Sequence, residues 1–251
     1  MPAISYVVPT LNSGKTLDAT LLSLKTQTDI DVEVIVVDSG STDNTLAICE
    51  RWGVTVLYAP PGNMYAAINL GLSQCTAPWF AYLNSDDVLY TDSLSRLIQY
   101  GNQQAVDIVY GNCDYIDFHG RFMYGFRPPL PHWLKGIYRT CKRTGFAQQT
   151  SIFRRRLYHS LHGFDTDYQY AADLDFFVRA LTSGATFSFL SGPSVACFRL
   201  HDSQLSQQKG DVIDQEAQKA TTQLGTAKIS DRIVQLRWKS SNLLNYIERV
   251  I

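Results

Sequence analysis

The chain has 251 residues, of which 45% are hydrophobic and 18% are charged. This length suits one large domain with a substantial core, and the apolar content is too high for an intrinsically disordered protein. The 22 lysines and arginines against 23 aspartates and glutamates leave a net charge of -1, which argues against a general nucleic-acid-binding coat. No apolar run approaches the ~20 residues of a membrane-spanning helix, and the N-terminus lacks the basic leader and cleavage site of a signal peptide. We therefore expect a cytoplasmic α/β protein that is an enzyme or a small-molecule binder.

The five cysteines are an odd number, are widely spaced and form no Cys-x-x-Cys pair. This pattern argues against both a zinc site and a disulfide framework. We expect reduced thiols at Cys49, Cys75, Cys113, Cys141 and Cys197.

Strand and helix patterns alternate along the first 110 residues. Continuous apolar runs, typical of strands buried on both faces of a parallel sheet, cover 4–8, 32–37, 54–58, 79–83 and 106–110. Between them, segments that each open near a polar starter residue predict helices over 15–25, 43–52, 64–73 and 91–100. The alternation predicts an open, twisted sheet with right-handed crossovers, whose ligands bind beyond the carboxyl ends of the strands.

Three polar segments follow the predicted strands, at 9–13, 38–43 and 84–87, and we expect them to meet at one crevice. The last contains Asp86 and Asp87, whose adjacent carboxylates repel each other unless a positive charge lies beside them. A divalent cation is one explanation, and a turn followed by a helix cap is the other.

A block without acidic residues runs from 118 to 164. All 23 acids lie outside it, whereas nine lysines and arginines lie inside it. Trp133, Tyr138 and Phe146 interleave with these cations, as happens in segments at a membrane surface. The block is either a solvated basic face or a contact for an anion, such as a lipid-linked diphosphate sugar or an anionic membrane.

The C-terminal part is helical in pattern, apart from short strands expected around Phe187 and Val195. Leu174, Phe177 and Leu181 have helical spacing. The tail over 211–251 predicts an amphipathic helix or helix pair docked on the body through its apolar residues, which are Ile229, Ile233, Leu236, Leu243, Leu244, Ile247 and Ile251.

Four motifs occur together in one order: VVPTLN at 7–12, VVDSGSTD at 36–43, YAAINLG at 65–71 and LNSDD at 83–87. In this order and spacing they resemble the family 2 glycosyltransferases of the GT-A fold, well over 3–115 and more thinly to about 206. The resemblance implies an α/β fold with an open, mostly parallel, Rossmann-like sheet flanked by helices. It also implies a nucleotide-sugar-binding half over 1–115 and an acceptor-binding half with the catalytic base over 116–210, before the helical segment 211–251.

The resemblance assigns the nucleotide of the donor to the loop after the first strand, through Pro9, Thr10 and Asn12. Asp38 corresponds to the first of two acids that help to seat the nucleobase in this family. Ser39 replaces the second acid, so the preference for a nucleobase stays open.

The segment 65–71 is similar to one that lines the donor site in the family, which makes Tyr65 and Asn69 donor-binding residues by resemblance. The packing of a helix on the sheet explains the same residues equally well. Ala66 stands where the family usually has an aspartate.

The motif around Asp86 resembles the family's Asp-x-Asp element, with Asn84 at its first acidic position. The resemblance therefore places Asn84 and Asp86 at the donor, and Asp86 and Asp87 at a divalent cation, Mg²⁺ or Mn²⁺. His201 belongs to a segment similar to the late Arg-x-His element, whose histidine contacts the metal or the diphosphate. A structural role for His201 is the alternative.

The segment around Asp173 resembles the family's Glu-Asp element, whose aspartate is the general base, although Ala172 replaces its glutamate. A carboxylate at the start of a helix is kept ionised by the positive helix end. A plain N-cap role is the alternative reading of Asp173. Asp175 can pair with Arg179 one turn later, so we expect Asp175 to be structural.

The implied reaction is metal-dependent, inverting transfer of a sugar from a nucleoside diphosphate to an acceptor hydroxyl. The family suggests bacterial surface-polysaccharide or glycolipid assembly, with the protein in the cytoplasm or peripheral at the inner face of the membrane. A non-catalytic module that binds sugar nucleotides or glycans is the alternative, because Ser39, Ala66 and Ala172 all depart from the family pattern. A nucleotidyltransferase or a dinucleotide oxidoreductase would need a glycine-rich loop after the first strand, which this sequence lacks.

Overall fold

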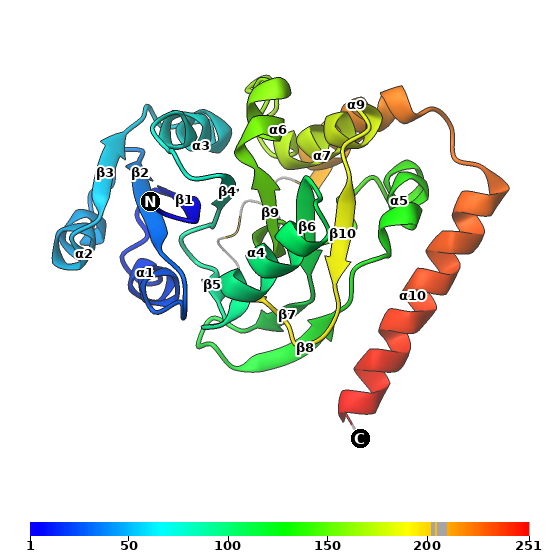
Figure 1. Cartoon of the computed structure of the whole chain (residues 1–251), viewed down its shortest axis with the longest axis horizontal. Helices are drawn as coiled ribbons and strands as arrows, with labels where there is room; N and C mark the ends of the chain where they lie inside the picture. Colours follow the sequence, from blue (N-terminus) through cyan, green and yellow to red (C-terminus); the bar gives the residue numbers. More distant parts are fainter. Residues whose placement is uncertain (202–203, 205–209, 251) are drawn as a thin grey trace.

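The computed structural model describes residues 1–201, 204 and 210–250, with the backbone alone for 244–250. Its central sheet has seven strands in the order β10-β6-β9-β4-β1-β2-β3 (Figure 1). Their bounds are β1 (Ile4–Thr10), β2 (Val32–Asp38), β3 (Thr55–Tyr58), β4 (Trp79–Tyr82), β6 (Ile108–Gly111), β9 (Ser151–Arg154) and β10 (Phe187–Leu190). Only β9 runs antiparallel to its neighbours, so the predicted open and mostly parallel sheet is confirmed.

Helices cover both faces of this sheet, because successive residues of a strand point to opposite sides. Val7 of β1 packs in the same cluster as residues of α3 and α7, whereas Tyr6 and Val8 pack with residues of α1, α2 and α4. These helices are α1 (Leu17–Lys25), α2 (Thr45–Trp52), α3 (Met64–Ser73), α4 (Ser93–Gln103) and α7 (Ala172–Thr182).

Gly71 lets α3 lie directly on the sheet. A Cβ atom at this position would lie 2.6 Å from Val7 Cγ2, a distance so short that the helix or the strand would have to shift. The close approach brings the start of α3, with Tyr65, to the carboxyl edge of β1 and β4.

A second, four-stranded sheet has the order β5-β11-β7-β8 and was not predicted from the sequence. Its strands are β5 (Val88–Leu89), β7 (Cys113–Ile116), β8 (Phe122–Phe126) and β11 (Ala196–Arg199). Because β5 follows Asp87 directly and pairs with β11, this sheet brings the 84–87 loop beside the segment that ends at His201.

The middle of the chain, within the predicted acceptor half, adds short elements. They are η1 (Pro131–Trp133), α5 (Leu134–Cys141), η2 (Gln148–Thr150) and α6 (Arg155–Ser160). Within the block 118–164, ion pairs tie Arg121, Arg139, Arg143 and Arg156 to acids elsewhere in the chain. Four of the nine cations of the block are thus paired with acids, and its role as a solvated face or as a contact for an anion remains a prediction.

The tail contains two helices and a short turn, which are α9 (Gly210–Thr221), η3 (Thr222–Leu224) and α10 (Ile229–Val250). Helix α9 packs on α7, and α10 packs on α5 and β8 (Figure 1). The expectation that the apolar residues of the tail dock on the body is wrong for Ile229, Ile233, Leu236 and Leu243, because they are exposed. The side chains of Leu244 and Ile247, and residue Ile251, lie outside the described part. None of the described helices combines the length and the apolar character needed to cross a bilayer.

The division at residue 115 remains a prediction. The central sheet takes β9 and β10 from beyond that residue, so both parts share one sheet. All five cysteines are free thiols.

Candidate functional site

A cavity of about 1040 Å³ opens at the carboxyl ends of β1, β2 and β4. Each of the three predicted strand-end loops contributes to its wall, through residues 9–13, Ser39 and residues 84–86. The start of α3 and the start of α7 close another side, with Tyr65 and Asp173. The structure therefore brings the predicted loops together and adds the predicted base to the same cavity.

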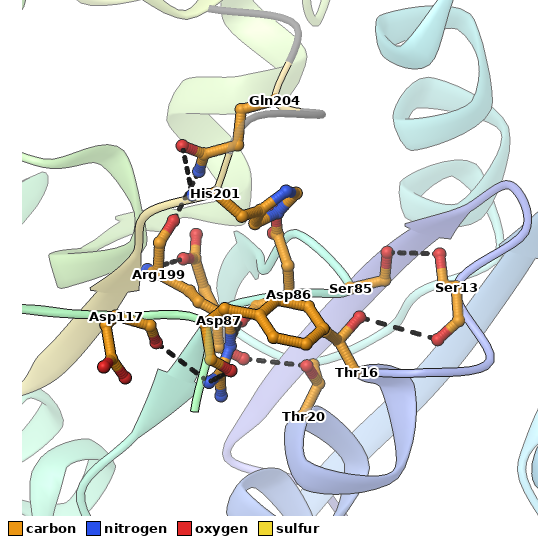
Figure 2. Close-up of polar contacts among 11 residues, drawn as sticks. Ser13, Thr16, Thr20, Ser85, Asp86, Asp87, Asp117, Arg199, His201 and Gln204 are labelled. Atoms are coloured by element: carbon orange, nitrogen blue, oxygen red, sulfur yellow. Dashed lines mark hydrogen bonds and ion pairs between the residues drawn. The ribbon is translucent and has the colours of Figure 1, made fainter. Parts of the chain in front are cut away.

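Hydrogen bonds tie the loop after β1 to the two other loops. Asn12 has a left-handed backbone, with φ of 52°, and its side-chain oxygen accepts a hydrogen bond from the Thr42 backbone N–H at 2.8 Å. The hydroxyls of Ser13 and Ser85 share a hydrogen bond of 2.6 Å (Figure 2). The side chain of Asn12 thus fixes the loop, while Pro9, Thr10 and Asn12 all line the cavity.

Asp38 lies behind the cavity wall. Its carboxylate is buried and accepts hydrogen bonds from the Thr10 hydroxyl at 3.3 Å and from the backbone N–H groups of Gly40 and Ser41 at 3.0 Å each. The next residue, Ser39, is the one that lines the cavity. Asp38 therefore shapes the loop that presents Ser39.

Asp86 and His201 form a pair at the cavity wall, with 2.9 Å between Asp86 Oδ2 and His201 Nε2 (Figure 2). Carboxylate oxygen and imidazole nitrogen are both ligands that divalent cations accept. Nearby, Asn84 Oδ1 is buried without a hydrogen-bond partner within the described part of the chain. This donor set fits a divalent cation.

The described residues contain no group of three or more His, Cys, Asp or Glu side chains arranged to hold a metal ion. The pair of Asp86 and His201 would supply two ligands to a cation, which would need further oxygens from a bound diphosphate or from water.

Asp87 points away from this pair and into the protein. It is 1% exposed, and its Oδ1 accepts a hydrogen bond of 2.9 Å from the backbone N–H of Arg199. Burial, followed by the charge of Asp86, raises the pKa of Asp87 well above its usual value. Arg199 also donates to the carbonyl oxygens of Asp86 at 2.8 Å and Phe118 at 2.9 Å. Asp87 and Arg199 therefore brace the loop that carries Asp86 (Figure 2).

Asp173 is the second residue of α7 and lines the cavity. The N-cap of α7 is Ala171, so the N-cap reading of Asp173 is wrong. Its Oδ1 accepts a 2.7 Å hydrogen bond from the Leu174 backbone N–H and lies 3.3 Å from the Tyr65 hydroxyl. Burial raises the pKa of Asp173 to about 6, which leaves a basic carboxylate that is ionised near neutral pH.

Asp175 has the structural role expected of it. Its Oδ2 accepts from Arg179 Nε at 2.6 Å, and Arg179 also donates to the carbonyl oxygens of Leu161 and Gly163. This network fixes α7 against the loop before it.

The structure does not bring Asn69 to the cavity. Its amide donates to the Phe164 carbonyl at 2.7 Å and accepts from the Tyr158 hydroxyl at 2.7 Å. With both ends of the amide engaged, Asn69 joins α3 to the segment before α7. Of the two interpretations of Asn69, packing of α3 fits these contacts and donor binding does not.

Several residues of the site had no motif to identify them. Glu216 of α9 accepts hydrogen bonds of 2.8–2.9 Å from the backbone N–H groups of Gln169, Tyr170 and Ala171, just before α7. The cavity wall itself contains Phe126, Gln148, Gln149 and Trp238, which no motif identified. Lys142 and Arg143 also line it, and they belong to the basic block 118–164, for which contact with an anion was one of the two predictions. The runs Lys142-Arg143 and Gln148-Gln149 were visible as local signals, whereas Glu216 and Trp238 are brought in only by the packing of the tail.

Sequence comparison places this chain beside known glycosyltransferases. The model of the glycosyl transferase family 2 matches residues 5–161. The PGL/p-HBAD biosynthesis glycosyltransferase of Mycobacterium tuberculosis is 31% identical over 192 residues, which are 73% of this chain and 72% of the relative. The poly(ribitol-phosphate) beta-N-acetylglucosaminyltransferase TarP of Staphylococcus aureus is 32% identical over 119 residues, covering 44% of this chain and 36% of that protein.

Solved structures of similar fold include S. aureus TarS 1-349 in complex with UDP-GlcNAc, at a TM-score of 0.64 and 23% identity, covering 80% of this chain and 59% of that one. The mannosyltransferase PcManGT of Pyrobaculum calidifontis, in complex with GDP-Man and Mn²⁺, has a TM-score of 0.58 and 17% identity, covering 96% of this chain and 81% of that one. These likenesses confirm the expected GT-A fold.

Proposed function

Because this chain belongs to glycosyl transferase family 2 and is a glycosyltransferase, we propose that it performs metal-dependent, inverting transfer of a sugar from a nucleoside diphosphate to an acceptor hydroxyl. The single observation that carries the proposal is the cavity shared by the Asp86–His201 pair and by Asp173. One side offers ligands for a cation, and the other offers a base.

Asp86 and His201 are the residues that would hold Mg²⁺ or Mn²⁺, and the buried Asp87 and Arg199 keep Asp86 in place. Such a cation neutralises the negative charge that develops on a departing diphosphate. PcManGT was solved in complex with GDP-Man and Mn²⁺, and that complex is in keeping with a cation beside the nucleotide sugar here.

Asp173 accepts the proton of the acceptor hydroxyl while the hydroxyl oxygen attacks the anomeric carbon. The bond from that carbon to the diphosphate oxygen breaks as the new bond forms, which inverts the configuration. Burial and the nearby Tyr65 hydroxyl hold the carboxylate in place. A positioned general base of this kind contributes roughly 10²–10⁴-fold in rate.

The donor occupies the part of the cavity lined by Pro9, Thr10, Asn12 and Ser39. We assign the donor sugar to the region of Gln148 and Gln149, where Gln148 Oε1 and Gln149 Nε2 are buried without hydrogen-bond partners within the described part of the chain. Such amide groups are suited to pair with sugar hydroxyls.

The acceptor enters from the end lined by Phe126, Trp238, Lys142 and Arg143. Aromatic rings suit the apolar faces of sugars or phenols, and the two cations suit a phosphate. A lipid-linked or phosphate-bearing acceptor in polysaccharide or glycolipid assembly offers groups for the aromatic rings and for the cations. Two relatives are named for PGL/p-HBAD biosynthesis and for poly(ribitol-phosphate).

A panel of UDP-, GDP-, ADP- and dTDP-sugars with Mn²⁺, followed by thermal shift and by donor hydrolysis, tests the proposal. We expect one nucleotide sugar to raise the midpoint of thermal unfolding only when Mn²⁺ is present. The sugar of that donor should be released slowly to water with inverted configuration, which proton NMR detects. Binding without any hydrolysis or transfer would instead identify a non-catalytic sugar-nucleotide module.

A further inference from the structure

Helix α10 carries an apolar stripe on the side that faces away from the body. Ile229, Ile233, Leu236 and Leu243 follow one another at intervals of four, three and seven residues, which places them on one helix face. Their exposed fractions are 81%, 49%, 67% and 61%. No other part of the described chain covers this stripe.

The opposite face fixes the orientation of the helix. Trp238 Nε1 and Asn242 Nδ2 each donate to the Arg127 carbonyl oxygen at 2.9 Å, and Asp231 pairs with Arg139 at 3.4 Å. These contacts hold α10 against α5 and β8, so the apolar stripe cannot turn inward without breaking them. Figure 1 shows α10 as the outermost helix on the side of α5.

Cations accompany the stripe. Arg232, Arg237 and Lys239 are exposed, whereas the one acid between residues 229 and 243, Asp231, has a side chain that is 13% exposed and is paired with Arg139. Over residues 229–243, the outward side of α10 is therefore apolar and positively charged. This charge complements an anionic lipid surface, and it disfavours pairing with a second copy, which would bring like charges together.

We propose that α10 docks the protein on an anionic lipid surface, with its axis along the plane of the membrane and its apolar stripe among the lipids. The helix has the acceptor end of the cavity on its inner side, because Trp238 lines that cavity. Docking through the outer side would therefore bring a lipid-anchored acceptor to the cavity entrance.

Vesicle flotation tests the docking without any donor or acceptor, so its result does not depend on the proposed function. The probes are vesicles of phosphatidylcholine alone and of phosphatidylcholine mixed with phosphatidylglycerol, across a salt series. We expect binding to the anionic vesicles that weakens with salt. The pair Leu236→Ser and Leu243→Ser should lower the bound fraction at least about tenfold. Replacement of Arg232, Arg237 and Lys239 by glutamine should remove the preference for anionic vesicles.

The matched control is the pair Leu22→Ser and Leu70→Ser, which alters two exposed leucines of α1 and α3. This control should bind as the wild type does, and circular dichroism should show equal melting for all variants. Equal binding of the wild type to neutral and anionic vesicles would overturn the proposal. A loss of vesicle binding in the control as large as that in the Leu236→Ser and Leu243→Ser pair would also overturn it. A dimer that Leu236→Ser and Leu243→Ser converts to a monomer, with no vesicle binding by the wild type, would identify a self-association surface instead.

Discussion

At the scale of single residues, the direction of a side chain decides which member of a motif can reach a ligand. In the pair of adjacent acids, Asp86 lines the cavity beside His201, whereas Asp87 is buried against Arg199. The motif identified the loop from residue types alone. It could not separate the two acids, because their directions depend on β5 and β11, and the pairing of those strands had no sequence signal.

Asp86→Ala and His201→Ala should both abolish the Mn²⁺-dependent part of nucleotide affinity, because each removes a ligand on the cavity wall. Asp87→Ala should instead lower stability, since it leaves the buried N–H of Arg199 without its acceptor, at a cost of about 1–3 kcal/mol. Isothermal titration with and without Mn²⁺, together with urea unfolding, separates the two effects. Equal loss of Mn²⁺-dependent affinity and unchanged stability in Asp87→Ala would make Asp87 a ligand.

Asp173→Asn should lower kcat by roughly 10²–10⁴-fold while donor affinity is retained, because the amide cannot accept the proton. Asp167→Asn, an exposed aspartate shortly before α7, is the matched control and should leave kcat unchanged. Single-turnover kinetics with saturating donor measure the chemical step. A variant that turns over as fast as the wild type would remove Asp173 from the role.

The same substitution should stabilise the protein at neutral pH. Burial raises the pKa of Asp173 from 3.8 to about 6, so its contribution to stability is present below pH 4 and is lost as pH rises through 6. Asp173→Asn avoids that loss and should be about 1–3 kcal/mol more stable at pH 7.5. Urea unfolding at pH 4 and 7.5 should show the difference only at the higher pH. A destabilised variant at pH 7.5 contradicts this reasoning.

At the scale of elements, the strands of the first half follow the sequence closely, because β-branched apolar runs at this length have few alternatives. The four-strand sheet could not be predicted, since β5 has two residues and only one residue separates β6 from β7. The prediction for α10 was also wrong about which face contacts the body, because it expected the apolar residues, four of which are exposed, to dock. The apolar stripe of α10 gave a clear periodicity, but the face that contacts the body carries Trp238, Asn242 and Asp231, whose polar groups form hydrogen bonds or an ion pair there.

Helix α9 packs on α7 and also supports the segment before α7 through the side chain of Glu216. Glu216→Gln weakens three hydrogen bonds from backbone N–H groups to a carboxylate just before α7, which should cost about 1–2 kcal/mol and lower kcat more than donor affinity. Glu50→Gln, at an exposed position of α2, is the control. Chemical denaturation and steady-state kinetics measure the two effects, and unchanged values in both would show that α9 does not position the base.

At the scale of the whole molecule, the site depends on segments distant in the sequence that share one sheet. The proposed donor loops come from the first 86 residues, and the proposed base comes from α7. The hydroxyl of Tyr65 on α3 joins them, because it lies 3.3 Å from Asp173 Oδ1 and 3.1 Å from the Tyr170 carbonyl oxygen. The sequence predicted both sets of residues by resemblance, but it gave no sign of this link.

The hydrogen bond between Tyr65 and Asp173 should affect the pH dependence of kcat. The Tyr65 hydrogen bond lowers the pKa of Asp173 against the larger effect of burial, so the acid limb of kcat should fall near pH 6 and move to higher pH in Tyr65→Phe. Profiles of kcat between pH 5 and 8, measured at saturating metal, give the acid limb of the wild type and that of Tyr65→Phe. An acid limb that does not move in Tyr65→Phe would show that the tyrosine does not act on the base.

The proposed reaction requires a cation at Asp86 and His201, a nucleotide sugar and Asp173 to meet in one cavity. A crystal structure of Asp173→Asn, soaked with Mn²⁺ and the donor chosen by thermal shift, tests it most directly. We predict an anomalous manganese peak within bonding distance of Asp86 and His201 Nε2, with the anomeric carbon between the diphosphate and residue 173. A manganese peak or a donor on another face of the protein would exclude this arrangement.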